Sequence, residues 1–330
     1  KSYMFLAHGL NRGPYQLKNT TMRRYLLLFL PLLFACNPQK ESSDESILMD
    51  SVFTTPLGKT FEIPAPSEKL LAQYEEAKAT FEANPEDVEA LIWYGRRTAY
   101  LGQYRQAIDI YSKGLEKFPN EPRLYRHRGH RYISIREYDK AIADFEKAAE
   151  LIQGSADEIE PDGMPNALNI PVSSLHGNIW YHLGLAYYLT HQYEKAYVSY
   201  LKCRESGNHY DNIVSSTHWL YMIQQRLGNP SKADSLLSPI HADSTVIENQ
   251  SYADLCQLYK GWMTVDSLFQ DGPGSPSNDA IRYGVANWYL YHGDSAKAKQ
   301  LMKELTESKV FTSFGYLAAE SDLIKVFGQK

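Results

Sequence analysis

Three basic residues, Arg123, Arg126 and His130, recur at a spacing that suits recognition of an anion. They occupy positions i, i+3 and i+7, so in a helix they share one face. A guanidinium group forms paired hydrogen bonds with carboxylate and phosphate groups. The spacing therefore predicts a basic surface on a chain whose net charge is −5.

A metal site is less well supported by the same stretch. His127 and His130 would project from adjacent turns of a helix, as a pair of metal ligands does. Neighbouring Arg126, Arg128 and Arg131 would repel a cation, so we favour a solvated helix face. The sequence has no Gly-rich phosphate loop, no H-E-x-x-H and no G-x-S-x-G. We therefore expect no catalytic residue, no metal and no cofactor.

The composition is that of an ordinary soluble globular protein, with 43% hydrophobic and 22% charged residues. The negative net charge argues against general affinity for nucleic acid, because such proteins usually present a strongly basic face. The length of 330 residues does not indicate how many domains the chain has, because a fold that grows by adding repeats need not be divided into separate domains.

A repeat of 34 positions (129 − 95) runs through the first half of the chain. It consists of Gly95, Tyr104, Ala107 and Tyr111, echoed by Gly129, Tyr138, Ala141 and Phe145. A third stretch contains W-x2-L-G-x2-Y from Trp180 to Tyr187, followed by Ala196 and Tyr200. These patterns resemble the tetratricopeptide repeat, a pair of antiparallel helices of about 34 residues that stacks on its neighbours.

The resemblance implies an all-α, right-handed superhelical solenoid. The glycine of each first helix would let the second helix approach closely, and the aromatic residue at the end of each pattern would fill the gap to the next pair. We expect a helix at 66–83 capped by Ser67, pairs at 86–118, 121–152, 177–206, 212–240, 248–270 and 278–307, and a closing helix at 312–327. An acidic insertion at about 153–176 separates the second pair from the third.

The N-terminal region resembles a bacterial lipoprotein signal. Arg23 and Arg24 precede a run of about ten apolar residues, too short for the roughly 20 that cross a bilayer. Leu33 to Cys36 resembles a lipobox, in which the cysteine is lipidated. We expect an upstream translated segment at 1–21, a signal peptide at 22–35, a lipidated flexible tether at 36–65 and the repeat domain at 66–330. An ordinary secretory signal with an incidental cysteine is the alternative.

A lipoprotein signal would place the protein in the bacterial cell envelope. Asn37 after the lipidated cysteine favours the outer membrane, on its periplasmic or surface face. Cys203 and Cys256 would lie on different helix pairs, about 10 Å or more apart, which exceeds the reach of a disulfide. We therefore expect two buried free thiols.

In the family, the first helix of each pair lines the concave binding side. The residues that this projection places there as partner contacts are Arg96, Tyr100, Arg123, Arg126, His130, Asn178, Tyr181 and Tyr188. We expect the arginines to accept an acidic or C-terminal carboxylate segment of a protein, with the tyrosines supplying flat contact area. Two alternatives stay open: the acidic insertion folds back and neutralises the arginines, or they are solvated.

The function expected from these features is that of a lipid-anchored scaffold or adaptor that binds a protein or peptide, and not an enzyme. One alternative is a carbohydrate-binding or small-ligand-binding accessory protein or enzyme that uses the insertion and the Tyr-rich third unit. Another is a purely structural subunit of an envelope complex.

Overall fold

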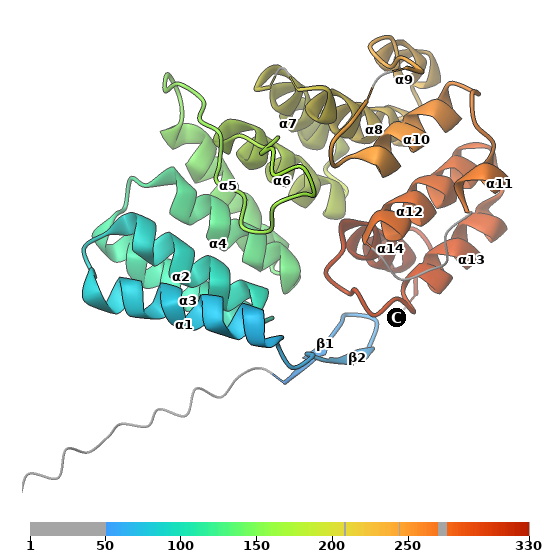
Figure 1. The fold of residues 1–330 in the computed structure, drawn as a ribbon. Coiled ribbons are helices and arrows are strands. Elements are labelled where there is room, and N and C mark those ends of the chain that lie inside the picture. The colour runs from blue at the N-terminus through green and yellow to red at the C-terminus, as the bar shows by residue number, and fades with distance from the viewer. Residues whose placement is uncertain (1–50, 208, 244, 270–275, 330) are drawn as a thin grey trace, which may run out of the picture. The chain divides into compact units, whose positions relative to one another are not determined.

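The structure, a computed structural model, describes residues 51–207, 209–243, 245–269 and 276–329. The expected upstream segment at 1–21, signal peptide at 22–35 and lipidation site at Cys36 lie outside these residues. Nearly all the regular structure in the described part is helical (Figure 1). Within these residues, no helix combines the length and the apolar character that crossing a membrane requires.

The helices follow the predicted order. A single helix, α1 (Glu68–Ala83), is capped by Ser67 as expected. The pairs are α2 (Val88–Tyr100) with α3 (Tyr104–Lys117), α4 (Pro122–Ser134) with α5 (Tyr138–Leu151), α6 (Leu175–Leu189) with α7 (Tyr193–Glu205), α8 (Tyr210–Arg226) with α9 (Pro230–Leu236), α10 (Gln250–Tyr259) with the short α11 (Val265–Leu268), and α12 (Pro276–Tyr291) with α13 (Ser295–Leu305). The last helix is α14 (Phe314–Lys325). The prediction of an all-α, tetratricopeptide-like solenoid of helix pairs is confirmed.

Close packing within each pair depends on the repeated glycine. A methyl group at Gly95 would lie 2.4 Å from the ring of Tyr111, which crosses it from α3. The Tyr111 ring also stacks on His127 of α4, with ring centroids 5.8 Å apart. The same arrangement places Phe145 between Gly129 and His182, and Tyr200 between Gly184 and Trp219. Each aromatic ring thus joins its own pair to the next one, as predicted.

The turn inside a pair needs a left-handed residue. Gly102, Gly228 and Gly293 supply it in three pairs, where positive φ costs glycine nothing. Arg136 and His191 occupy the same place in the second and third pairs, with φ of 66° and 62°. Both side chains reach α14, so these strained positions coincide with a long-range contact.

Helix α14 does more than close the end of the stack. It packs on α12 and α13 and also returns to α6 of the third pair (Figure 1). Ser321 of α14 donates a hydrogen bond to the carbonyl of Leu189 at 2.7 Å. Phe314 packs beside the rings of Tyr181 and His182. The C-terminal helix therefore covers part of the surface that the first helices were expected to offer to a partner.

Residues 51–65, which we expected to continue the flexible tether, form a β-hairpin instead. Strand β1 (Val52–Thr54) pairs antiparallel with β2 (Thr60–Glu62), with Phe53 opposite Phe61. Both rings stack on Phe311, each with centroids 5.0 Å apart. Burial of these aromatic rings against the C-terminal segment accounts for the order of the hairpin.

Cys203 and Cys256 are buried free thiols, as expected. Burial raises the pKa of Cys203 to about 12 and raises that of Cys256 as well. Both therefore remain protonated near neutral pH and behave as small apolar side chains.

Candidate functional site

The insertion between α5 and α6 folds back over the first helices of the first two pairs (Figure 1, yellow-green). Asp157 holds its base, because its carboxylate accepts hydrogen bonds from the Ser174 hydroxyl at 2.6 Å and from the backbone N–H of His176 at 2.9 Å. Ser174 in turn caps the N-terminus of α6. Both ends of the insertion are thereby attached to the beginning of the third pair.

Glu160 of the insertion contacts the basic side chains of α4. Its carboxylate lies 2.9 Å from Arg126 and 3.7 Å from Nε2 of His127, and it accepts a hydrogen bond from the amide of Asn178. Only 8% of Glu160 is exposed. Of the two alternatives, the structure therefore shows the first for Arg126: the acidic insertion folds back, and its Glu160 neutralises this arginine.

Backbone carbonyls of the insertion engage the first helix as well. Arg96 donates to the carbonyl of Pro161 at 2.9 Å, and Arg97 donates to that of Gly163 at 3.0 Å. A methyl group at Gly163 would lie 2.1 Å from the hydroxyl of Tyr100, so a larger residue here would require the Tyr100 and Arg96 side chains to move. The insertion is thus packed closely against α2.

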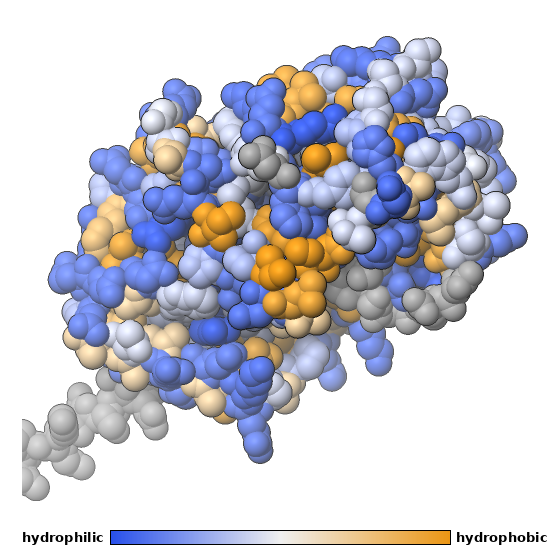
Figure 2. All heavy atoms as spheres, turned by 45° about the horizontal axis from the view of Figure 1, so that its top comes forward, coloured by the Kyte–Doolittle hydropathy of each residue, from blue (hydrophilic) through white to orange (hydrophobic). Residues whose placement is uncertain are grey.

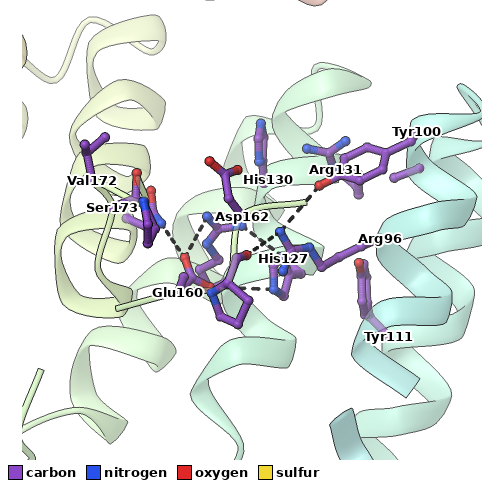
Figure 3. A pocket seen from close by; sticks show the side chains of 15 residues that line it. Arg96, Tyr100, Tyr111, His127, His130, Arg131, Glu160, Asp162, Val172 and Ser173 are labelled. Atoms are coloured by element: carbon purple, nitrogen blue, oxygen red, sulfur yellow. Dashed lines mark hydrogen bonds and ion pairs between the residues drawn. The ribbon is translucent and has the colours of Figure 1, made fainter. Parts of the chain in front are cut away.

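A cavity of about 170 Å³ remains beneath the insertion (Figure 3). Among its lining residues are Arg96, Arg126 and Arg131, against two carboxylates, Glu160 and Asp162. In the part of the chain that the structure describes, the Arg131 guanidinium has no ion pair or hydrogen bond. The guanidinium carbon of Arg131 lies over the ring of Tyr104, 5.6 Å from the ring centroid. Unlike Arg126, Arg131 is therefore available to an anion in the cavity.

The histidines around this cavity add no positive charge at neutral pH. Burial and the nearby Arg126 lower the pKa of His127 well below its usual value. Burial and Arg131 do the same to the pKa of His130. His182 lines a neighbouring cavity, with its ring centroid 4.4 Å from that of His130, and burial, with Arg126, lowers its pKa to about 3. The cavity therefore carries three permanent cations, neutral imidazoles and an excess of one positive charge.

The structure brings together five of the eight predicted contact residues: Arg96, Tyr100, Arg126, His130 and Asn178 all line this cavity. Arg123 points elsewhere and is paired with Glu121 at 2.8 Å and Glu89 at 2.6 Å. Tyr181 lines a neighbouring cavity.

Two of the sequence-based interpretations need correction. Tyr188 is not a surface residue: it is 1% exposed, and its hydroxyl is 2.8 Å from that of Tyr283. His127 does not lie on a solvated face but is buried against Tyr111. Packing of the C-terminal units and of the insertion covers both positions.

Sequence reasoning did not single out Arg131 or Glu160 as site residues. Arg131 follows His127 by four positions, so the two share a helix face, and this spacing could have indicated it. Glu160 lies in an irregular loop, and no periodicity indicates where a loop residue will point.

The outer face of the insertion exposes large hydrophobic side chains. Met164 and Leu168 are 66% and 64% exposed, and Ile159 and Ile170 are also open to solvent. Figure 2 shows hydrophobic surface near the middle of the side of the molecule in view, with further orange areas at the top and the left. Exposed apolar surface of this kind is typical of sites where proteins associate.

One of the repeats of this chain matches a known family of repeats. Residues 122–154, which include α4 and α5, match the family model described as Tetratricopeptide repeat. A solved structure described as "YrrB: a TPR protein with an unusual peptide-binding site" is 18% identical, with 74% of this chain and 96% of that chain covered and a TM-score of 0.40. A tetratricopeptide repeat protein from Parabacteroides merdae ATCC 43184 is 15% identical, with 76% and 92% covered and a TM-score of 0.45.

Proposed function

We propose that this chain is a lipid-anchored scaffold of the bacterial cell envelope that binds a protein partner through a carboxylate, at the partner's C-terminus or on an acidic side chain. The observation that carries the proposal is the Arg131 guanidinium, which has no ion pair or hydrogen bond among the described residues and lines a cavity with excess positive charge. Guanidinium binds carboxylate through two parallel hydrogen bonds, and partial burial strengthens such a contact.

The exposed hydrophobic face of the insertion supports a protein as the ligand. Met164 and Leu168 lie outside the cavity, so they offer contact area to a chain whose carboxylate enters it. A cavity of about 170 Å³ suits one carboxylate-bearing group rather than a folded segment. The remaining contacts must therefore come from the surface around it.

A carbohydrate or small-ligand site in the Tyr-rich third pair has less support. Tyr188 is buried, and the Tyr181 hydroxyl already accepts a hydrogen bond from Trp219 at 2.8 Å and lies 3.0 Å from the Tyr252 hydroxyl. These groups hold the core together and are not free to bind sugar hydroxyls.

The test uses the full chain in detergent and pools of fluorescent hexapeptides that end in a free carboxylate, end in an amide, or carry an internal Asp with an amidated end. Fluorescence polarisation should show at least tenfold tighter binding of a carboxylate-bearing pool than of the uncharged amide pool. Arg131→Gln should remove this difference, whereas Arg105→Gln on the surface should keep it. Equal binding of all three pools by the unsubstituted chain would overturn the proposal.

A further inference from the structure

A second cavity of about 540 Å³ adjoins the first and has the opposite electrostatic character. The two share three lining residues, Val172, Ser173 and Asn178. The second cavity lies between the insertion, α6, α8 and the segment before α10. The two cavities are therefore neighbours, so one extended ligand segment could contact both.

The walls of the second cavity combine aromatic rings with carboxylates. The rings are those of Tyr181, Tyr252 and Phe314. The carboxylates belong to Asp157, Glu158, Asp211 and Glu248. None of the described residues that line this cavity is Lys or Arg.

Two of the four carboxylates are committed to the fold. Asp211 is buried and accepts backbone N–H groups from Ile247 at 2.9 Å, Glu248 at 2.7 Å and Asn249 at 2.9 Å. Asp157 holds the base of the insertion. These two acids therefore position the walls of the cavity rather than bind a ligand.

The other two carboxylates remain available at the rim. Glu248 accepts one hydrogen bond, from Asn166 of the insertion at 2.6 Å, through Oε1 only. Glu158 makes no side-chain hydrogen bond or ion pair within the described part of the chain. Both residues are exposed, so a cation that approaches the mouth of the cavity can reach them.

We propose that the second cavity binds a basic side chain, Lys or Arg, of the same partner segment whose carboxylate enters the first cavity. Its apolar stem would lie along the aromatic rings and its charged end would reach Glu158 and Glu248. The shared ligand rests on the proposed function, whereas the preference of the second cavity for a basic side chain does not. The partner segment is thus bipolar, with a cation and a carboxylate a few residues apart.

The test is a selection from bead-bound random heptapeptides, in one library with free C-terminal carboxylates and in another with amidated ends, against the full chain in detergent. Lys or Arg should be enriched at least fivefold at one fixed position. The double variant Glu158→Gln/Glu248→Gln should lose this enrichment yet still prefer free carboxylates. The matched control Glu116→Gln/Asp139→Asn, with both residues exposed and outside the cavities, should behave like the unsubstituted chain.

Circular dichroism and a thermal melt identical to those of the unsubstituted chain would establish that the double variant is folded. Absence of Lys or Arg enrichment, or its persistence in the double variant, overturns the inference. Enrichment of Lys or Arg equally in both libraries, without a carboxylate preference, overturns the proposed function and the shared ligand instead.

Discussion

Arg136 and Glu320, 184 positions apart, form a buried ion pair in which Nε lies 2.9 Å from the carboxylate. Their side chains are only 5% and 2% exposed. Arg136 also donates to the carbonyl of Phe311 at 2.7 Å. The turn of the second helix pair is thus joined to the C-terminal helix, and the left-handed conformation of Arg136 is maintained by these contacts.

Glu320→Gln should destabilise the fold by about 3–5 kcal/mol, because it leaves the buried Arg136 guanidinium without its carboxylate. Urea denaturation followed by circular dichroism measures the change. Lys147→Gln removes an exposed ion pair with Glu150 and should have little effect. Equal midpoints for the two variants would show that the buried pair does not stabilise the fold.

Glu160→Gln should loosen the insertion without unfolding the helix pairs, because it removes the carboxylate that holds Arg126. Thermolysin cleaves before bulky apolar residues, so cleavage at the exposed Met164 and Leu168 should become several-fold faster. Glu158→Gln, which breaks no ion pair, serves as control. Unchanged cleavage in Glu160→Gln would mean that other contacts hold the insertion.

The buried His218 should make the fold less stable in mild acid. Burial lowers its pKa to about 3, so between pH 7 and pH 5 only the unfolded chain takes up its proton. Above the unfolded-state pKa of about 6.5, His218 does not reduce the free energy of unfolding. As the pH falls below this value, the free energy of unfolding decreases, by about 2 kcal/mol at pH 5. Replacing His218 with Gln should remove this part of the pH dependence.

Urea denaturation of the unsubstituted chain and of His218→Gln at pH 7 and pH 5 makes the comparison. Tyr252 and Tyr259, whose rings stack on His218, should stay uncharged throughout, since burial raises the pKa of both. The same loss of stability between the two pH values in both proteins would contradict the assignment to His218.

Cys36→Ser should abolish lipid attachment, because the proposed anchor is a thioether on that residue. Metabolic labelling with an alkyne fatty acid, followed by fractionation of the envelope, measures it. The variant should lose the label and its association with membranes, whereas Cys203→Ser should keep both. Labelling of Cys36→Ser at the original level would place the lipid elsewhere or argue against lipidation.

The sequence was sufficient to predict the helix pairs but not the surfaces they leave open. Gly95 and Tyr111 recur with a fixed period, and their packing is local, so the period predicts the contact between them. The return of α14 to α6 depends on Ser321 and Leu189, 132 positions apart, and no periodicity relates them. The basic cavity was predicted in part, because helix spacing groups Arg126 with His130. The return of the acidic insertion was one of the alternatives left open, but no spacing indicates that Glu160 is the residue that pairs with Arg126.

The β1–β2 hairpin determines which part of the fold would first bear a pulling force applied to the chain on its N-terminal side. Phe53 and Phe61 stack on Phe311, which lies in the segment that connects α13 to α14. Lys59 donates a hydrogen bond to the carbonyl of Thr306 at 3.0 Å. A pull on the chain before residue 51 would therefore act first on the C-terminal segment. The aromatic contacts would have to shear apart before force reached α1 and the first pair, so the hairpin would shield the two cavities from mechanical stress.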